Sequence, residues 1–431
     1  MEMKLKPIKI LVNFILFFFC VLYFGYAQKD TLNLSYCIET AINNNPQLKI
    51  AESTLGASEA SYTSSKSVLY PQLSLQSNWI RNGGTFFFGP TSRPANYENY
   101  SAGLQMQQLL FDFGKSYSRI SATENQRNAS EEDYQSIKQN LILNTNIVYF
   151  KLLQARRIRE VALEIVKQSE EHEKQAQGIY NVGKSSQYDL LKAKTDVANA
   201  RVNLISAEND VRIAILQLKN ILNTKISDDF ELVDNLEVNQ DSIDYNSALQ
   251  IALNNRHEIK SGQYIVEANK SMVTSAWDAN LPTLSGTAGY NWRSYSLDTP
   301  FLNSWSLGLN FSIPLFQGFA VDAAIDQQKS FLRASEASLE MLTQSVTLDV
   351  QQKYSNLREA KEKINATQQL VRQAEETLKL AEARYREGVG SPLEITDARV
   401  VYYNAKTSYI QSLYNYQVAF AGLQRAMGTL K

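Results

Sequence analysis

The chain has 431 residues, with 43 Lys and Arg against 44 Asp and Glu, so its formal net charge is -1, and 44% of its residues are hydrophobic. This composition excludes collagen-like, mucin-like and disordered chains, and also a bundle of transmembrane helices. The balanced charge leaves no electrostatic basis for binding nucleic acid, and 2 His and 2 Cys are too few for a zinc or disulfide framework. Length alone predicts two or three soluble domains.

The first 27 residues have the pattern of a secretory signal peptide. A basic start precedes an apolar run at 10–24, and small residues at Gly25 and Ala27 suit cleavage. Lipidation at Cys20 is the alternative, but the bulky residues before it argue against a lipoprotein site. No later stretch approaches the roughly 20 apolar residues of a spanning helix. We therefore expect an exported protein, and any membrane span must be something other than a helix.

The first half of the mature chain, 34–225, is predicted to run from helix to strands and back to helix. A polar helical segment ends at Pro71, and alternating apolar residues then predict strands at about 72–81 and 98–110, separated by a loop at 82–97. Two long helices complete this half. The second of them has an apolar column with a period of seven, followed by a column of small residues: Leu190, Val197, Leu204, Val211 and Leu218, then Ala193, Ala200, Ala207 and Ala214. Such heptads predict close packing against a neighbouring helix.

After a linker at 226–242, the second half, 243–429, repeats the first. The segment AINNNPQLK at 41–49 returns as ALNNRHEIK at 252–260, and Pro282 takes the place of Pro71. Strands are predicted at about 283–293 and 303–314, with a loop at 294–302, and two long helices follow. The last helix repeats an apolar residue every seventh position, at Ile395, Tyr402, Tyr409, Tyr416 and Leu423. We therefore expect one structural unit written twice.

The four predicted strands are apolar on one face and polar but uncharged on the other. Trp305, Leu307 and Leu309, for example, alternate with small polar residues. In an exported chain this pattern fits an outer-membrane β-barrel, and the alternative is a half-buried soluble sheet. Open strand edges are not tolerated in lipid, so copies of the chain must close the sheet. Two copies would give eight strands and a filled interior, whereas three give twelve and a lumen, which suits the polar inner face.

The order of these motifs resembles the TolC-like outer-membrane efflux protein family over about residues 34–429. The resemblance rests on the paired openings, on the returns from strand to helix (LFDFG at 110–114 and PLFQG at 314–318), on the Tyr-x-x-Gly turns at Tyr180 and Tyr385, and on the ending at 403–429. It implies an α+β membrane protein of the cell outer membrane. In this family four strands from each chain of a homotrimer close a 12-stranded β-barrel, which a long periplasmic α-helical coiled-coil barrel continues.

The resemblance also implies a function. Members are passive channel-tunnels for efflux or secretion, including multidrug export and type I secretion. They work with a periplasmic adaptor and an inner-membrane pump of the RND or ABC type. The chain is therefore expected to be no enzyme and to need no cofactor.

By the same resemblance, a periplasmic gate lies at the helix turns 180–190 and 385–398. Glu394 and Asp397 match an acidic pair at the entrance, and a trimer would form a ring of six carboxylates that favours cations. The alternative is that these are ordinary solvated acids of a first helical turn. Asp189 and Tyr385 match residues that latch the gate closed across neighbouring helices.

The turns themselves carry four further candidate residues. Gly183, Ser185, Gly388 and Gly390 are predicted to form the tips that face the adaptor, although a turn role alone explains them equally well. Gly390 departs from the family, which has an Arg at this position in the latch. Lys184 and Arg386 are the candidate replacements.

Two other classes of protein stay open as alternatives. The heptads alone fit an exported coiled-coil structural or adhesion protein. The stretch GIYNVGKS at 178–185 matches the phosphate loop of nucleotide-binding enzymes, but that loop follows a β-strand, and a helical segment precedes it here. His172 and His257 have no Cys or His at ligand spacing, so we expect no metal site.

Overall fold

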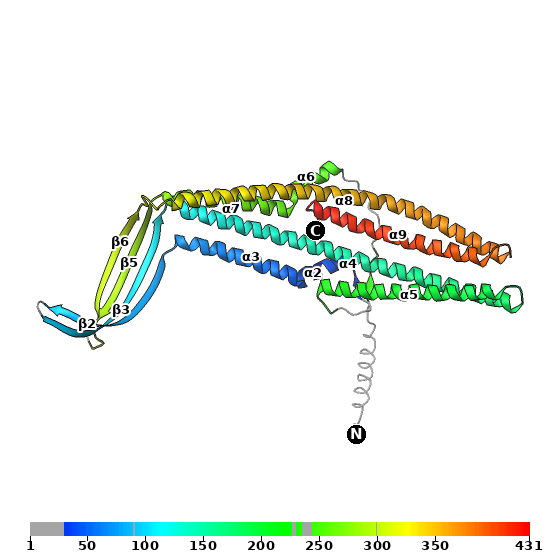
Figure 1. Cartoon of the computed structure of the whole chain (residues 1–431), viewed down its shortest axis with the longest axis horizontal. Coiled ribbons are helices and arrows are strands. Elements are labelled where there is room, and N and C mark those ends of the chain that lie inside the picture. The colour runs from blue at the N-terminus through cyan, green and yellow to red at the C-terminus, as the bar shows by residue number, and fades with distance from the viewer. Residues whose placement is uncertain (1–29, 89–90, 226–229, 235–243, 299) are drawn as a thin grey trace, which may run out of the picture. The chain divides into compact units, whose positions relative to one another are not determined.

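A computed structural model of the chain describes residues 30–88, 91–225, 230–234, 244–298 and 300–431, without the side chains of 30, 85–88, 91–95 and 97 (Figure 1). The predicted signal peptide, 1–27, and Cys20 lie outside the described residues.

The described chain passes twice through the same order of elements. The first series is α2 (Leu34–Asn44), α3 (Pro46–Ser65), the 3-10 helix η1 (Lys66–Leu69), β2 (Gln72–Phe88), β3 (Thr91–Phe111), α4 (Lys115–Asn181) and α5 (Gln187–Leu222). The second series is α6 (Tyr245–Asn255), α7 (His257–Trp277), η2 (Asp278–Asn280), β5 (Thr283–Ser294), β6 (Leu302–Ser312), α8 (Ala320–Arg386) and α9 (Pro392–Ala426). Two short strands, β1 (Asp30–Leu32) and β4 (Phe230–Leu232), precede the two series.

Local sequence explains where the helices begin. Pro46 and Pro392 occupy the first positions of α3 and α9, where a missing N–H costs nothing. The side chains of Asn33, Ser186 and Asp244 accept hydrogen bonds from the first free N–H groups of α2, α5 and α6. Among the described helices, none combines the length and the hydrophobicity needed to cross a bilayer.

The chain forms two compact units, to which α4, α8 and α9 each contribute different parts. Of the described residues, unit 1 comprises those up to residue 45, those in 144–239 and those in 360–418. Unit 2 comprises 46–143, 240–359 and 419–431.

Unit 2 contains an antiparallel sheet with the strand order β2-β3-β5-β6 (Figure 1). Its register aligns Leu75, Leu104, Tyr290 and Trp305 in one row across all four strands. The outer edges of β2 and β6 have no strand partner among the described residues. The sheet is therefore open at both edges within one chain.

The predicted loop at 82–97 is wrong. β2 continues to Phe88 and β3 begins at Thr91, so the two strands pair from Asn82↔Tyr97 out to Phe88↔Thr91. Two strands that are already in register gain further backbone hydrogen bonds by continuing to pair. The glycines at 83 and 84 do not interrupt this ladder.

One face of the sheet exposes large apolar side chains. Seven of them on the two edge strands are between 59% and 79% exposed: Leu73, Leu75, Trp79, Trp305, Leu307, Leu309 and Phe311. A contiguous apolar face of this kind marks a surface that something other than water covers. The half-buried soluble sheet does not fit this exposure, and a plain coiled-coil rod does not account for the sheet at all.

The predicted linker, 226–242, is also partly structured. Phe230–Leu232 forms β4, which pairs in parallel with β1. The hydroxyl of Tyr149 on α4 donates a hydrogen bond of 2.6 Å to the carbonyl of Val233, and Phe230 is buried. Residues 226–229 and 235–242 lie outside the described residues. A strand of three residues is too short to show a period in the sequence, and its partner lies about 200 residues earlier in the chain. The sequence pattern therefore could not predict this strand.

The core of unit 1 is made by the heptad positions of the long helices. Ile395, Ala398, Tyr402 and Ala405 on α9 are buried against Leu378 and Ala374 on α8 and against Val161 and Ile165 on α4. Small residues between the larger ones let the helix backbones approach closely. The heptad prediction for these positions is confirmed by their burial, within a single chain.

Candidate gate at the helix turns

The first turn joins α4 to α5 in unit 1 and includes the candidates Gly183 and Ser185. Gly183 has a φ of 72°, which a residue with a side chain adopts only at a cost. Its N–H donates to the carbonyl of Tyr180 at 2.9 Å, and the N–H of Lys184 donates to that of Ile179 at 3.1 Å. These two bonds satisfy the carbonyls at the end of α4, so a left-handed glycine closes the helix here.

Asp189 is held by hydrogen bonds of its own turn. Ser186 and Asp189 form a reciprocal capping box at the start of α5, and the hydroxyl of Ser185 donates to the Asp189 carboxylate at 2.8 Å. Burial opposes the ionisation of Asp189, but the hydrogen bonds from Ser185 and Ser186 outweigh it and keep the pKa of this carboxyl below its ordinary value. Ser185 and Asp189, predicted separately as tip and latch residues, are therefore direct partners.

The second turn joins α8 to α9 and resembles the first. Gly388 has a φ of 77°, and its N–H donates to the carbonyl of Tyr385 at 3.0 Å. The N–H groups of Val389 and Gly390 both donate to the carbonyl of Arg384 at 3.0 Å. The backbone thus folds back tightly on the last turn of α8.

This tight approach explains the glycine at position 390. A Cβ atom built on Gly390 would lie 2.9 Å from the backbone nitrogen of Tyr385 and 2.9 Å from Cβ of Arg384. No side chain fits at that distance without moving the backbone. The Arg that the family resemblance predicts here is therefore excluded by this turn, and the departure at Gly390 is a steric necessity of the observed conformation.

A different arginine pairs with the predicted acidic pair. Nε of Arg384, at the end of α8, lies 3.2 Å from Oε2 of Glu394, in the first turn of α9. Arg384 also donates to the carbonyl of Val389 at 3.3 Å. Asp397 is exposed and has no ion-pair partner in the described part of the chain. The candidate replacements Lys184 and Arg386 form no ion pair with a described residue either.

Tyr385 and Asp189 lie near each other without a hydrogen bond between them among the described residues. Burial and the negative charge of Asp189 raise the pKa of the Tyr385 phenol. The Tyr385 ring packs against the ring of His172, with centroids 5.3 Å apart and the planes at 64°. In one chain, therefore, the predicted latch residues are neighbours rather than bonded partners.

Behind the turns lies a buried polar cluster that the sequence patterns did not single out as a group. Arg399 is 7% exposed and donates to Glu382 at 3.3 Å, while its Nε and Nη1 atoms have no hydrogen-bond partner. Thr396 donates to Asp196 on α5 at 2.6 Å. Burial lowers the pKa of Arg399, which the charge of Glu382 opposes. These groups fall between heptad positions, where sequence alone suggests a solvated face.

His172 completes this cluster from α4. It is 4% exposed, and burial together with the positive charge of Arg399 lowers the pKa of His172 to about 4, against a smaller opposite effect of Asp196. The side chain is therefore neutral near pH 7. The sequence analysis named His172 only in expecting no metal site, and gave no sign of its burial. In the part of the chain that the structure describes, no three His, Cys, Asp or Glu side chains are grouped to hold a metal ion.

The phosphate-loop alternative fails on its structural context. Gly178 lies inside α4, and Lys184 and Ser185 lie in the turn that follows this helix. A phosphate loop needs a β-strand before it, so that successive N–H groups surround the phosphates. The sequence match at 178–185 therefore does not indicate a phosphate-binding loop.

Comparison with known proteins identifies the family. The family model described as "Outer membrane efflux protein" matches residues 37–224 and 248–429, which leaves out the region of the predicted linker. Both helix turns, α4 to α5 and α8 to α9, lie inside the matched ranges.

Individual relatives agree with this match. The chain is 28% identical over 416 residues to the outer membrane protein TolC of Escherichia coli, covering 92% of this chain and 82% of TolC. Two solved structures share its fold. The CmeC outer membrane channel of Campylobacter jejuni has a TM-score of 0.82 at 20% identity, covering 92% of this chain and 85% of that one. The MtrE outer membrane channel of Neisseria gonorrhoeae has a TM-score of 0.80 at 20% identity, covering 92% and 89%.

Proposed function

We propose that this chain, which belongs to the outer membrane efflux protein family, is one third of a passive homotrimeric export duct. Membership of this family makes the chain an efflux protein of the cell outer membrane. The observation that carries the trimer is the open four-stranded sheet of unit 2, whose apolar face is exposed.

The open edges of β2 and β6 are the reason for more than one copy. In hydrocarbon, unpaired backbone groups find no water to bond to, so a spanning sheet must close on itself. Four strands are too few to close, eight leave an interior that side chains fill, and twelve leave a lumen. Three copies supply twelve strands, with the row through Leu75, Leu104, Tyr290 and Trp305 facing the lipid and the polar row facing the lumen. The twofold order of elements in each chain supports the duplicated unit predicted from the sequence.

The gate of this duct lies at the two turns of unit 1. Three copies of Glu394 and Asp397 would surround a narrow mouth with six carboxylates, which concentrates a negative potential and favours cations. Arg384 offsets part of the charge of Glu394, so Asp397 carries the larger share of the selectivity. Asp189 and Tyr385 hold the gate closed by hydrogen bonding across neighbouring helices.

The turn tips are the contact surface for other proteins of the export path. Gly183 and Gly388 are exposed, and nothing lies within 4 Å of their Cβ positions, which leaves the backbone there open to a periplasmic adaptor; Ser185 and Gly390 belong to the same two turns. Through the adaptor an inner-membrane pump of the RND or ABC type delivers the cargo. The duct itself supplies no energy and catalyses no reaction.

Native mass spectrometry of the detergent-solubilised full-length product tests the trimer. We expect one species with the mass of three mature chains. Leu307→Arg, on the apolar face, should prevent insertion into the outer membrane, whereas Asn310→Arg, on the opposite face of β6, should still insert. A folded, membrane-inserted monomer or dimer would contradict the proposal.

A further inference from the structure

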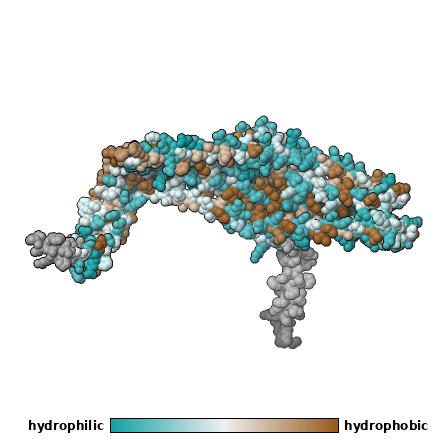
Figure 2. Space-filling view, viewed as in Figure 1, coloured by the Kyte–Doolittle hydropathy of each residue, from teal (hydrophilic) through white to brown (hydrophobic). Residues whose placement is uncertain are grey.

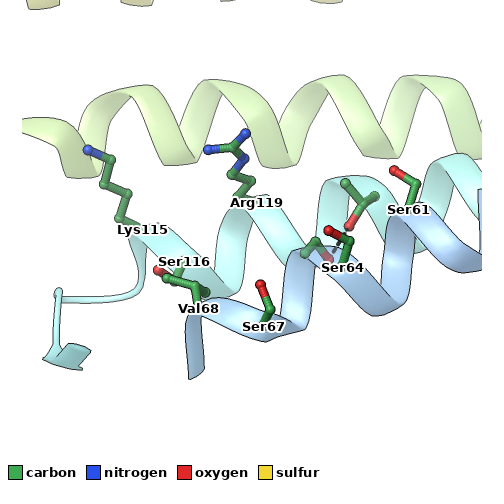
Figure 3. A pocket seen from close by; sticks show the side chains of 9 residues that line it. Ser61, Ser64, Ser67, Val68, Lys115, Ser116 and Arg119 are labelled. Carbon is green, nitrogen blue, oxygen red and sulfur yellow. Dashed lines mark hydrogen bonds between the residues drawn. The ribbon is translucent and has the colours of Figure 1, made fainter. Parts of the chain in front are cut away.

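A cavity of about 370 Å³ lies in unit 2 between the end of α3 with η1 and the first turns of α4. Its lining is entirely hydroxyl-bearing or basic apart from Val68 and contains no carboxylate. Figure 3 shows Lys115 and Arg119 extending from α4 toward the helix drawn in pale green, with Ser61, Ser64 and Ser67 on the neighbouring blue helix, and all five side chains are exposed. The cavity combines two positive charges with several hydroxyl donors.

The two cations of this cavity have no acidic partner. Neither Lys115 nor Arg119 forms an ion pair with any residue in the described part of the chain. They lie four residues apart, so they project from the same side of α4. The N–H groups at the start of α4 are not part of the site, because Asp112 accepts hydrogen bonds from Gly114 and Ser116.

The hydroxyls on the other side of the cavity are also available. Thr123 and Ser65 are bonded to each other at 2.8 Å. The hydroxyls of Ser61, Ser64 and Ser67, in contrast, make no hydrogen bond to a described residue. Lys, Arg and free hydroxyl donors around one cavity without a carboxylate are the chemistry that binds a phosphate group.

The position of the cavity in unit 2 points to the source of that phosphate. η1 ends three residues before β2 begins, and Lys115 follows the end of β3 by four residues. Exposed aromatic side chains lie at the same end of the sheet: Tyr70, Phe111, Phe113, Tyr117, Phe316 and Phe319 are between 48% and 76% exposed. Figure 2 shows hydrophobic surface gathered where α8 begins, next to this end. Aromatic belts of this kind mark the level of the lipid headgroups.

We propose that this cavity binds the phosphate group of an anionic phospholipid in the periplasmic leaflet of the outer membrane. Lys115 and Arg119 neutralise the phosphate charge, and the serine hydroxyls donate to its remaining oxygens. The site would fix the depth of the sheet in the bilayer where it returns to helix. The inference uses the outer-membrane location and does not depend on the trimer, the gate or any partner.

Titration of palmitoyl-oleoyl phosphatidylglycerol onto the detergent-purified wild-type protein, followed by native mass spectrometry, tests the site. We expect Lys115→Gln/Arg119→Gln to weaken the binding of this lipid by about tenfold or more, because two charge-assisted contacts are lost. Ser64→Ala/Ser67→Ala keeps both charges and should weaken binding by a smaller factor. The control is Lys329→Gln/Arg333→Gln, which removes the same charges at the same spacing on α8, outside the cavity.

Two ligand arms separate the lipid from soluble phosphate. Diacylglycerol with the same acyl chains should bind wild type and variant equally, because it has no phosphate. If inorganic phosphate binds with the same dependence on Lys115 and Arg119 while phosphatidylglycerol does not, the lipid source is wrong and the site is one for free phosphate. Equal binding of both probes to wild type and to Lys115→Gln/Arg119→Gln overturns the proposal. Channel conductance is not the readout, so failure here is distinct from failure of the duct.

Discussion

Arg384 and Glu394 are joined across the turn between α8 and α9, with Nε and Oε2 3.2 Å apart. The two residues are ten positions apart in the sequence, and each side chain is nearly half exposed. An ion pair this exposed contributes little to stability. Its effect is on the local charge, because it sets a cation beside one of the two predicted ring carboxylates.

Arg384→Gln should therefore raise the cation selectivity of the channel. A unit charge about 4 Å away changes the energy of an ion by about 1 kcal/mol in water, so the cation-to-anion permeability ratio should rise by up to about fivefold. The reversal potential in a salt gradient across a planar bilayer measures this ratio. Asp397→Asn should lower it by more than Glu394→Gln does, because Arg384 already offsets Glu394. The control Arg333→Gln removes a cation far along α8 and should leave the permeability ratio unchanged. A lower ratio in Arg384→Gln would refute the carboxylate ring.

Gly390→Ala should destabilise the turn by about 1–3 kcal/mol, because the added Cβ meets backbone atoms of Arg384 and Tyr385 at about 3 Å. Thermal unfolding followed by circular dichroism measures the loss. Gly178→Ala is the control: nothing lies within 4 Å of its Cβ position inside α4, so this change should stabilise the helix slightly. Gly390→Arg should likewise weaken the turn instead of restoring a family-like latch. An unchanged unfolding temperature of Gly390→Ala would show that the turn accommodates a Cβ atom at this position.

Acid should loosen the cluster around His172. The unfolded side chain takes up a proton near pH 6.5 and the folded one only near pH 4, so stability is lost as the pH falls from 6.5 to about 4, and no more is lost below that. Arg399 works against protonation and Asp196 favours it. His172→Gln should reduce the difference in unfolding temperature between about pH 7.5 and about pH 4.5. The control is His257→Gln, which changes the second histidine of the sequence and lies in unit 2, whereas His172 lies in unit 1. An equal reduction in both variants would count against His172.

Glu382→Gln should destabilise the protein more than Arg399→Met does. Removing the Glu382 charge takes away the ion-pair partner of the buried Arg399 guanidinium and leaves only the nearby charges of Asp196 and Glu171, at a cost of about 1–3 kcal/mol once the partial exposure of Glu382 is allowed for. Arg399→Met replaces the buried cation with an apolar chain of similar length and should be nearly neutral. Glu375→Gln breaks an exposed pair with Lys379 on the same helix and should leave stability nearly unchanged. The reverse order of the first two variants would show that Arg399 is stabilised by other groups.

Much of the helical packing could be predicted from the sequence, because a period of seven is a property of the chain itself. Ile395, Tyr402, Tyr416 and Leu423 recur at that period, and all four are buried. The ends of the strands could not be predicted in the same way. β2 and β3 extend through 82–97 because each stabilises the other, and alternation within one segment carries no information about its partner.

The candidate site shows the same division. The turn glycines at 183 and 388 could be predicted from the sequence, because a left-handed conformation favours glycine. The pairs Arg384 with Glu394 and Arg399 with Glu382 join residues from facing helices, so they depend on the turn that brings the helices together. The resemblance to the family leads one to expect an Arg at position 390, where the backbone leaves no space for a side chain.

Single-channel recording of the purified protein in a planar lipid bilayer tests the duct most directly. The account predicts channels of low conductance that select cations, with the selectivity reduced by Asp397→Asn. A silent bilayer from protein that is folded and stable as a monomer would contradict it.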